Sequence, residues 1–206
     1  MNRLVSMDTE SINGLKTAKE KMGAETFANG DQTLTLIQTE NGRTILLEPN
    51  VYPPRPYSRM YQLTFTEGFA NKYPVQGYAF RPEQLAGEVP DHENLSGHSF
   101  IPAEARKTVM ERYKHPIVRD IEDEARQVGG HGGMDFIMDY RLVYCLQHGL
   151  PLDQDVYDAA EWSCIGALTA ASLGHNKAPV AVPDCTRGDW AKNSEGVTPS
   201  SLAASR

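Results

Sequence analysis

A helix with a defined start and end lies within residues 129–162, which read GGHGGMDFIMDYRLVYCLQHGLPLDQDVYDAAEW. Its apolar residues follow one stripe along a helix of about 3.6 residues per turn: Met134, Ile137, Met138, Leu142, Cys145 and Leu146. Gly149 suits the left-handed residue that closes a helix, and Pro151 prevents continuation. The sequence therefore predicts a helix that ends at Gly149.

A second helix is expected after Asp155, whose carboxylate can accept hydrogen bonds from the first free backbone amides. Asp158 stands three residues further on, in the spacing of a capping box. Further apolar positions follow at Val156, Ala159, Ala160, Trp162 and Leu168. These apolar positions predict a hairpin of two packed helices.

The N-terminal part of the chain predicts strands. The runs 33–39 and 43–48 are rich in β-forming residues and flank Asn41-Gly42, a strong hairpin signal because both turn positions need positive φ. Further strands are expected at 3–9 (at a sheet edge), 58–64, 75–80 and 178–182, with a turn at 67–69. Helices are expected at 12–22, 103–113 and 116–127.

Strands thus precede helices, which favours an α+β fold: an open, mainly antiparallel β-sheet with helices packed on one face. Residues 1–190 are expected to form one domain. Residues 191–206, rich in Ser, Ala, Gly and Pro, predict a disordered tail.

Composition excludes several classes of protein. The chain has 206 residues and a formal net charge of −7 without a basic run, so it lacks the electrostatic footprint of a nucleic-acid-binding protein. No apolar window reaches the roughly 18 residues of a membrane helix, and residues 1–11 lack the apolar core of a signal peptide. A cytoplasmic location is the default expectation. Cys145, Cys164 and Cys185 show no metal-ligand spacing and are expected to be reduced and structural.

Several catalytic motifs are missing from the sequence. It contains no G-x-G-x-x-G, no Walker loop, no G-x-S-x-G and no H-E-x-x-H, and no metal site is predicted. The glycine-rich segment 129–133 opens a helix and so offers free amides to an anion. Glycines this dense equally allow two elements to pack closely, which is the simpler interpretation.

The sequence resembles a known family in three stretches. Residues 129–163, the later PDCTRGDW, and the segment GDQTLTLIQTENGRTILLEPNVYPPRPYSRMYQLTFTEGFANKYP are similar to the C-terminal part of glycoside hydrolase family 109. These are NAD-dependent glycosidases of the Gfo/Idh/MocA superfamily, typified by α-N-acetylgalactosaminidase. The resemblance covers roughly residues 1 to 190 and implies a Gfo/Idh/MocA C-terminal-like domain.

The resemblance also implies what this chain does not carry. Family members begin with a Rossmann domain that binds NAD, followed by a Y-P-T-H segment with the proposed catalytic residues. Neither is found here, so the chain is expected to start just past them, to contain no catalytic residue and to bind no cofactor alone. In the complete enzyme, NAD oxidises the sugar transiently so that elimination can expel the aglycone. Complete members are often exported.

Tyr57 is the first candidate substrate-binding residue. In an extended strand Arg55, Tyr57 and Arg59 share a face, and a phenol can hydrogen-bond a sugar hydroxyl. The resemblance implies that Tyr57 contacts substrate, and a contact with the cofactor is also possible. The alternative is a half-buried aromatic residue on a sheet face between two solvated arginines.

His131 is the second candidate. Imidazole titrates near neutrality, so His131 could orient a substrate hydroxyl or shuttle a proton, or else simply cap the helix. Asp135, one turn into that helix, complements the helix dipole and is expected to be structural.

The leading hypothesis is the substrate-side and oligomerisation domain of a family 109-like glycosidase, inactive without a Rossmann partner. Its expected ligand is an N-acetylgalactosaminide-like carbohydrate, and its expected protein partner is either another copy of the chain or a Rossmann domain. Two alternatives stay open. One is a non-catalytic binding or assembly module, and the other is the C-terminal half of a Gfo/Idh/MocA sugar oxidoreductase.

Overall fold

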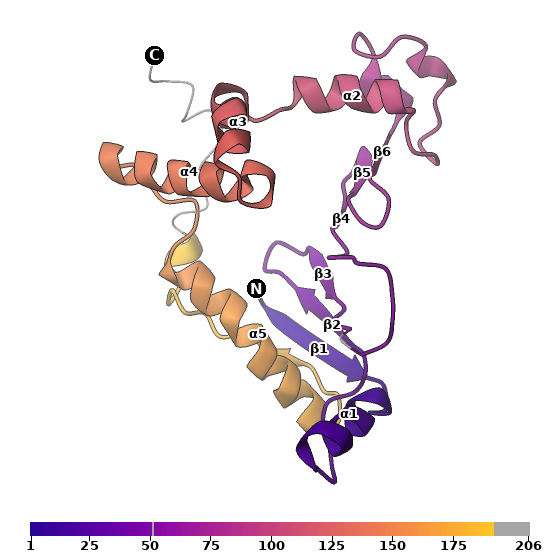
Figure 1. Cartoon of the computed structure of the whole chain (residues 1–206), viewed down its shortest axis with the longest axis vertical. Coiled ribbons are helices and arrows are strands. Elements are labelled where there is room, and N and C mark those ends of the chain that lie inside the picture. The colour runs from indigo at the N-terminus through magenta and orange to yellow at the C-terminus, as the bar shows by residue number, and fades with distance from the viewer. Residues whose placement is uncertain (51, 192–206) are drawn as a thin grey trace. The chain divides into compact units, whose positions relative to one another are not determined.

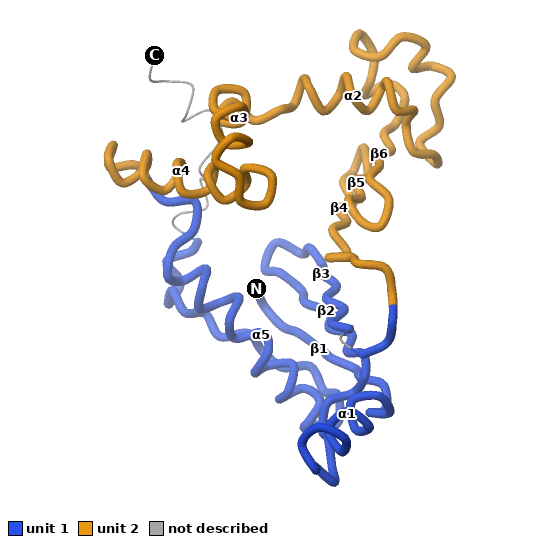
Figure 2. The backbone as a smooth tube through the Cα atoms, viewed as in Figure 1, with its two compact units in different colours: residues 1–54, 151–198 blue, residues 55–150, 199–206 orange. Residues whose placement is uncertain are grey.

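The structure, a computed structural model, describes residues 1–50 and 52–191. The chain forms two compact units (Figure 2). Unit 1 comprises residues 1–54 and 151–198, and unit 2 comprises residues 55–150 and 199–206. The predicted α+β class is confirmed, since helices accompany two open antiparallel sheets. The predicted tail from 192 to 206 lies outside the described residues.

Unit 1 is a four-stranded sheet with a long helix against it (Figure 1). The strands run in the order β3 (Thr44–Leu47), β2 (Thr33–Gln38), β1 (Arg3–Asp8) and β7 (Val180–Ala181). Helix α5 (Val156–Gly174) packs against β1 and β7. Helix α1 (Asn13–Met22) connects β1 to β2, and a short 3₁₀ turn, η4, covers Asp189–Ala191.

The sheet of unit 1 buries one face. Leu4 pairs with Ile37 across β1 and β2, and both side chains enter a core with Val182 and, from α5, Ile165 and Leu168. Side chains at alternate positions point the other way, so Leu36 is exposed. This one-sided burial is the pattern expected of an antiparallel sheet with a helix on one face.

Strand β1 is interior, not at the edge as its sequence predicts. The segment after α5 returns to pair with it, with Arg3 opposite Ala181 and Leu4 opposite Val180. Strand β7 is only two residues long, so it cannot pair with all of β1. Further along β1, helix α5 provides a hydrogen-bond partner. The Ser6 amide donates to the Ser172 hydroxyl oxygen (3.0 Å), and that hydroxyl donates to the Ala178 carbonyl (2.7 Å).

The predicted hairpin between β2 and β3 is confirmed, but its turn differs from the expected one. Only Gly42 of the two central residues has positive φ (73°). The Thr39 amide donates to the Arg43 carbonyl (2.8 Å) and the Gly42 amide to the Thr39 carbonyl (3.0 Å). The loop therefore has three residues with glycine in the left-handed position, a geometry that also matches strand twist.

Unit 2 begins with a second sheet, in the order β4 (Gln62–Thr64), β5 (Gly68–Asn71) and β6 (Gly77–Phe80). The 3₁₀ turns η1 (Pro82–Leu85) and η2 (His92–Asn94) follow, then α2 (Ala103–Arg112), α3 (Pro116–Val128), η3 (His131–Gly133) and α4 (Met134–His148). Leu85, Val89, Ile101, Ala105 and Val109 form its core, with Tyr78 and Phe80 packed against them.

The strand expected at 58–64 is therefore shorter and joins a separate sheet, and the turn expected at 67–69 is the start of strand β5. The expected helical hairpin is also replaced. Helix α4 packs against α3 in unit 2, whereas α5 packs against the sheet of unit 1. Of the predicted stripe on α4, Cys145 is buried, while Met134, Met138, Leu142 and Leu146 are exposed.

Both predicted helix ends are confirmed. Gly149 closes α4 in the left-handed conformation, with φ 62°. Asp155 caps α5 by accepting from the Tyr157 amide (2.7 Å) and the Asp158 amide (3.1 Å), and the Asp155 amide donates to the Asp158 carboxylate (2.9 Å). This reciprocal pattern is a capping box.

Candidate functional site

The segment 55–59 approaches the second sheet without being part of it. The expected strand, with Arg55, Tyr57 and Arg59 on one face, does not form, because β4 starts only at Gln62. Met60 takes a positive φ of 47°, and its amide donates to the Ser58 hydroxyl (2.9 Å), a local turn that interrupts a strand. Arg55 is exposed in the same segment.

Tyr57 is nevertheless held in place by specific contacts. The Arg59 Nε donates to the Tyr57 hydroxyl oxygen at 2.7 Å. The ring of Tyr57 meets Tyr73 edge to face, with 5.6 Å between centroids and 86° between planes. The Lys72 Nζ lies 5.5 Å from the centroid of the Tyr73 ring. Together these contacts fix the ring while its side chain stays 67% exposed.

These contacts define what the phenol can do. The hydrogen bond with Tyr57, and then the charge interactions with the Tyr57 and Tyr73 phenols, raise the pKa of Arg59 above its ordinary value. A tyrosine hydroxyl has one proton to donate as well as lone pairs to accept. Because Arg59 already donates to the oxygen, the proton of Tyr57 is available for an acceptor on a ligand. Tyr73 was not predicted to take part, and no sequence pattern singles it out.

His131 forms a pair with Asp135. The His131 Nδ1 lies 2.9 Å from the Asp135 Oδ2, and both side chains are accessible to solvent. A carboxylate that accepts from Nδ1–H leaves Nε2 as the acceptor of a neutral imidazole. Among the residues that the structure describes, no hydrogen bond, ion pair or ring contact joins His131 to Tyr57 or Arg59.

Two glycines of the segment 129–133 allow close packing. A Cβ on Gly133 would lie 2.8 Å from the backbone carbon of Ala125 on α3, and one on Gly130 would lie 2.8 Å from the Asp135 carboxylate. The interpretation that these glycines let two elements approach is confirmed for Gly133, whereas a Cβ on Gly129 or Gly132 would meet no atom within 4 Å. A bound anion would meet the negative charge of Asp135 at the start of α4, so the segment is a poor anion site.

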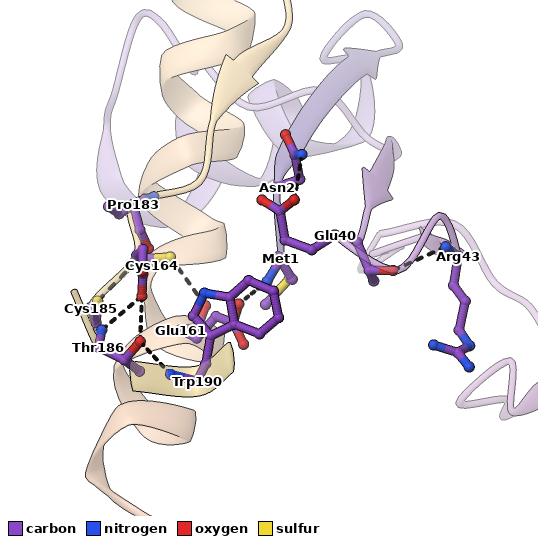
Figure 3. Close-up of polar contacts among 12 residues, drawn as sticks. Met1, Asn2, Glu40, Arg43, Glu161, Cys164, Pro183, Cys185, Thr186 and Trp190 are labelled. Atoms are coloured by element: carbon purple, nitrogen blue, oxygen red, sulfur yellow. Dashed lines mark hydrogen bonds and ion pairs between the residues drawn. The ribbon is translucent and has the colours of Figure 1, made fainter. Parts of the chain in front are cut away.

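The late motif PDCTRGDW folds as a compact turn beside α5 (Figure 3). Asp184 accepts from the Thr186 hydroxyl (2.6 Å), the Thr186 amide (2.9 Å) and the Gly188 amide (2.6 Å). The bond from the Thr186 hydroxyl is the main reason that the pKa of Asp184 is lowered. The Trp190 amide donates to the Thr186 hydroxyl oxygen (3.1 Å), close to Cys164 and Glu161. The motif is therefore structural.

The cysteines and the possible metal-binding side chains can also be checked within the described part of the chain. The three cysteines are free thiols, and burial raises the pKa of Cys164. Between residues 1 and 191, position 51 aside, no group of three His, Cys, Asp or Glu side chains is placed to hold a metal ion. Over the same residues, no helix is long and apolar enough to span a membrane.

The fold places this chain in the α+β class, and comparison with known proteins gives its family. Residues 1–192 match the family described as Glycosyl hydrolase 109, C-terminal domain, and this chain belongs to it. It is 57% identical over 195 residues to Glycosyl hydrolase family 109 protein 1 of Phocaeicola vulgatus, covering 93% of this chain and 41% of the relative.

Two further relatives show the same relation. A protein of the same name from Bacteroides fragilis is 57% identical, and Glycosyl hydrolase family 109 protein of Porphyromonas gingivalis is 54% identical. In each case the match covers 93% of this chain and 42% of the relative. The chain thus spans about two fifths of the length of these curated relatives and corresponds to their C-terminal part.

Proposed function

We propose that this chain is the substrate-side and assembly part of an NAD-dependent glycosidase that acts on N-acetylgalactosaminide-like glycosides. In this proposal Tyr57, Arg55, Arg59 and His131 contact the sugar. The observation that carries it is the exposed Tyr57, whose ring Tyr73 fixes and whose oxygen Arg59 engages at 2.7 Å. A phenol held this way presents a directed hydroxyl to a sugar at little cost in conformational entropy.

The described residues do not fit NAD. A dinucleotide site needs parallel strands joined by a helix, with the pyrophosphate at the N-terminus of that helix. Every strand pair among residues 1–50 and 52–191 is antiparallel, and Asp135 stands at the start of α4. We therefore assign NAD binding to a Rossmann partner domain, and we derive no catalytic step from this chain alone.

Complementation tests this proposal. The chain is mixed with NAD and an aryl α-N-acetylgalactosaminide, with and without the part of the Bacteroides fragilis relative that precedes the matched region. We expect turnover only when both parts are present. Turnover by the isolated chain would contradict the dependence on a partner. A folded, associated mixture that leaves the glycoside intact would contradict the glycosidase assignment.

Tyr57→Phe tests the site itself. The variant keeps the ring contact with Tyr73 and loses the hydroxyl, so kcat/KM of the complemented enzyme should fall about 10-fold. Tyr61→Phe is the matched control, because Tyr61 is also exposed and lies in the adjacent chain segment. Equal kcat/KM values for the two variants would exclude Tyr57 from the sugar site.

A second candidate function is assembly without catalysis, and the uncovered face of the first sheet favours it. Met7, Leu34, Leu36 and Leu46 are exposed there, and exposed apolar patches on a sheet mark interaction surfaces. Size-exclusion chromatography distinguishes the candidates: a discrete oligomer that neither binds NAD nor supports turnover in the complemented mixture favours pure assembly.

A further inference from the structure

Unit 2 contains a cavity that involves none of the candidate site residues discussed so far. Its volume is about 1290 Å³, and it is lined by β5, β6, α2 and α3. Aromatic and aliphatic side chains dominate the lining, including Phe65, Phe69, Tyr78, Phe80 and Val118. Tyr57, Arg59 and His131 are not among its lining residues. The volume is somewhat above the range of about 300–1,000 Å³ typical of small-molecule sites.

The pairing of β5 with β6 places large aromatic side chains beside small residues at this cavity. Gly68 lies opposite Phe80 and Ala70 lies opposite Tyr78, so two small residues face two large ones on the same side of the sheet. A Cβ on Gly68 would come within 2.7 Å of the Phe80 ring. Gly68 therefore lets the Phe80 ring lie close to β5, and Phe80 and Tyr78 form an aromatic wall of the cavity.

Glu88 brings a carboxylate into this apolar space. Its side chain is only 10% exposed. The Oε1 pairs with the Arg112 Nε (3.1 Å) and accepts from the Tyr113 hydroxyl (3.3 Å). The Oε2 is buried, and no donor within the described part of the chain reaches it. A buried acceptor without a donor is costly, so this oxygen is best explained by a ligand that donates to it.

Two of the carboxylates that line the cavity are paired with cations. Arg112 neutralises Glu88, while Glu122 pairs with Lys114 and with Arg126 (2.6 Å). The side-chain hydrogen bond from Lys114 is the main reason that the pKa of Glu122 is lowered. At Glu88 and Glu122, an ionic ligand would have to compete with these pairs. A neutral hydroxyl, in contrast, would satisfy Glu88 without adding charge.

We propose that this cavity binds a neutral carbohydrate, as a second site independent of Tyr57. One ring face would pack on the aromatic wall, and a hydroxyl would donate to Glu88 Oε2. Gln84, Lys107 and Glu111 also line the cavity and offer partners for further hydroxyls. The volume leaves room for more than one sugar ring.

Binding to the full chain tests this proposal, by saturation-transfer NMR and by calorimetry. The probes are galactose, N-acetylgalactosamine, glucose and lactose, together with cyclohexanol as a ring that carries a single hydroxyl. At least one of the sugars should bind, and more tightly than cyclohexanol. Absence of binding by all four sugars, or equal binding of cyclohexanol, would overturn the proposal.

Variants then locate the site. Glu88→Gln should weaken sugar binding at least about 10-fold, because it removes the charged acceptor. Glu83→Gln, an exposed glutamate five positions earlier and outside the lining, is the matched control. Ala70→Leu fills the cavity without touching Glu88 and should also abolish binding, with unchanged circular dichroism as the check of folding. If Tyr57→Phe abolishes binding while these cavity variants retain it, the sugar occupies the Tyr57 site and the inference is wrong.

Discussion

In unit 1 the buried hydroxyls between sheet and helix are paired with each other, whereas in unit 2 a buried carboxylate keeps one oxygen without a donor. The Ser6 and Thr35 hydroxyls lie 2.8 Å apart, and Ser172 links β1 to the Ala178 carbonyl. Glu88 of unit 2 satisfies Oε1 only. A completed network fixes one packing arrangement, while an unsatisfied group stores free energy that a ligand can release. We therefore expect substitutions at the hydroxyls between the first sheet and α5 to affect stability, and a substitution at Glu88 to affect binding.

The largest effect is expected in the core of unit 1. Leu4 is 1% exposed, so Leu4→Ala should lower the free energy of unfolding by about 2–5 kcal/mol, through lost burial and the cavity left behind. Leu36→Ala is the matched control on the opposite face, where the side chain is 48% exposed, and should cost less than about 1 kcal/mol. Urea denaturation measures both values. Similar losses of unfolding free energy in the two variants would show that the face of the sheet that carries Leu36 is covered in solution.

The next effect concerns the hydroxyl network. Ser172→Ala leaves the buried Ser6 amide without its acceptor and should cost about 1–3 kcal/mol. Ser163→Ala changes an exposed serine of the same helix and should be close to neutral. If Ser172→Ala left the free energy of unfolding unchanged, the hydroxyl network of unit 1 would not contribute to stability, and the two units would not differ in this respect.

A smaller, pH-dependent effect is expected at Asp31, which caps α1 from outside the helix. It accepts from the Asn13 amide (2.8 Å) and the Gly14 amide (2.8 Å), and the bond from Asn13 is the main reason that its pKa is lowered. A lowered folded pKa gives stability that is present above the ordinary value of about 4 and is lost as pH falls through the folded value. The melting temperature should decrease below about pH 4, and Asp31→Asn should weaken this dependence. If the melting temperature of Asp31→Asn depended on pH as it does in the unaltered protein, the Asp31 carboxylate would not be the source of that dependence.

The smallest change in stability is expected for Glu88→Gln, a variant that should nevertheless weaken sugar binding. Arg112 and Tyr113 can turn to solvent, and the change removes a buried charge, so the free energy of unfolding should shift by less than about 1 kcal/mol. Chemical denaturation without added sugar measures it. A loss as large as that of Ser172→Ala would make Glu88 a structural residue and would contradict the comparison.

The sequence predicted features that depend on local chemistry. The hairpin at Asn41-Gly42, the end of α4 at Gly149 and the cap at Asp155 each depend on residues within a few positions of one another, and all three are confirmed. The interior position of β1 was not predictable, since it depends on pairing with residues 180 and 181 at the far end of the chain. Strand β5 was not predicted, because Gly68 in the sequence indicates a turn. In the structure, Gly68 is part of the strand and accommodates the ring of Phe80.

The candidate site was predicted only in part. Tyr57 and Arg59 do interact, but through a turn and not through a shared strand face. The roles of Tyr73 and Glu88 depend on distances between segments that sequence periodicity does not encode. The expected contacts of His131 and Arg55 with a sugar stay predictions.

The discontinuity of unit 1 sets the order in which it can be completed on the ribosome. Strands β1, β2 and β3 are synthesised first among these elements, whereas α5 and β7, which cover Leu4 and Ile37, follow only after all of residues 55–150. Until then the nascent sheet keeps both faces uncovered, and its β1 edge has no partner. Shielding of the early strands by a chaperone, or by a neighbouring domain, would therefore matter most while the middle of the chain is being translated.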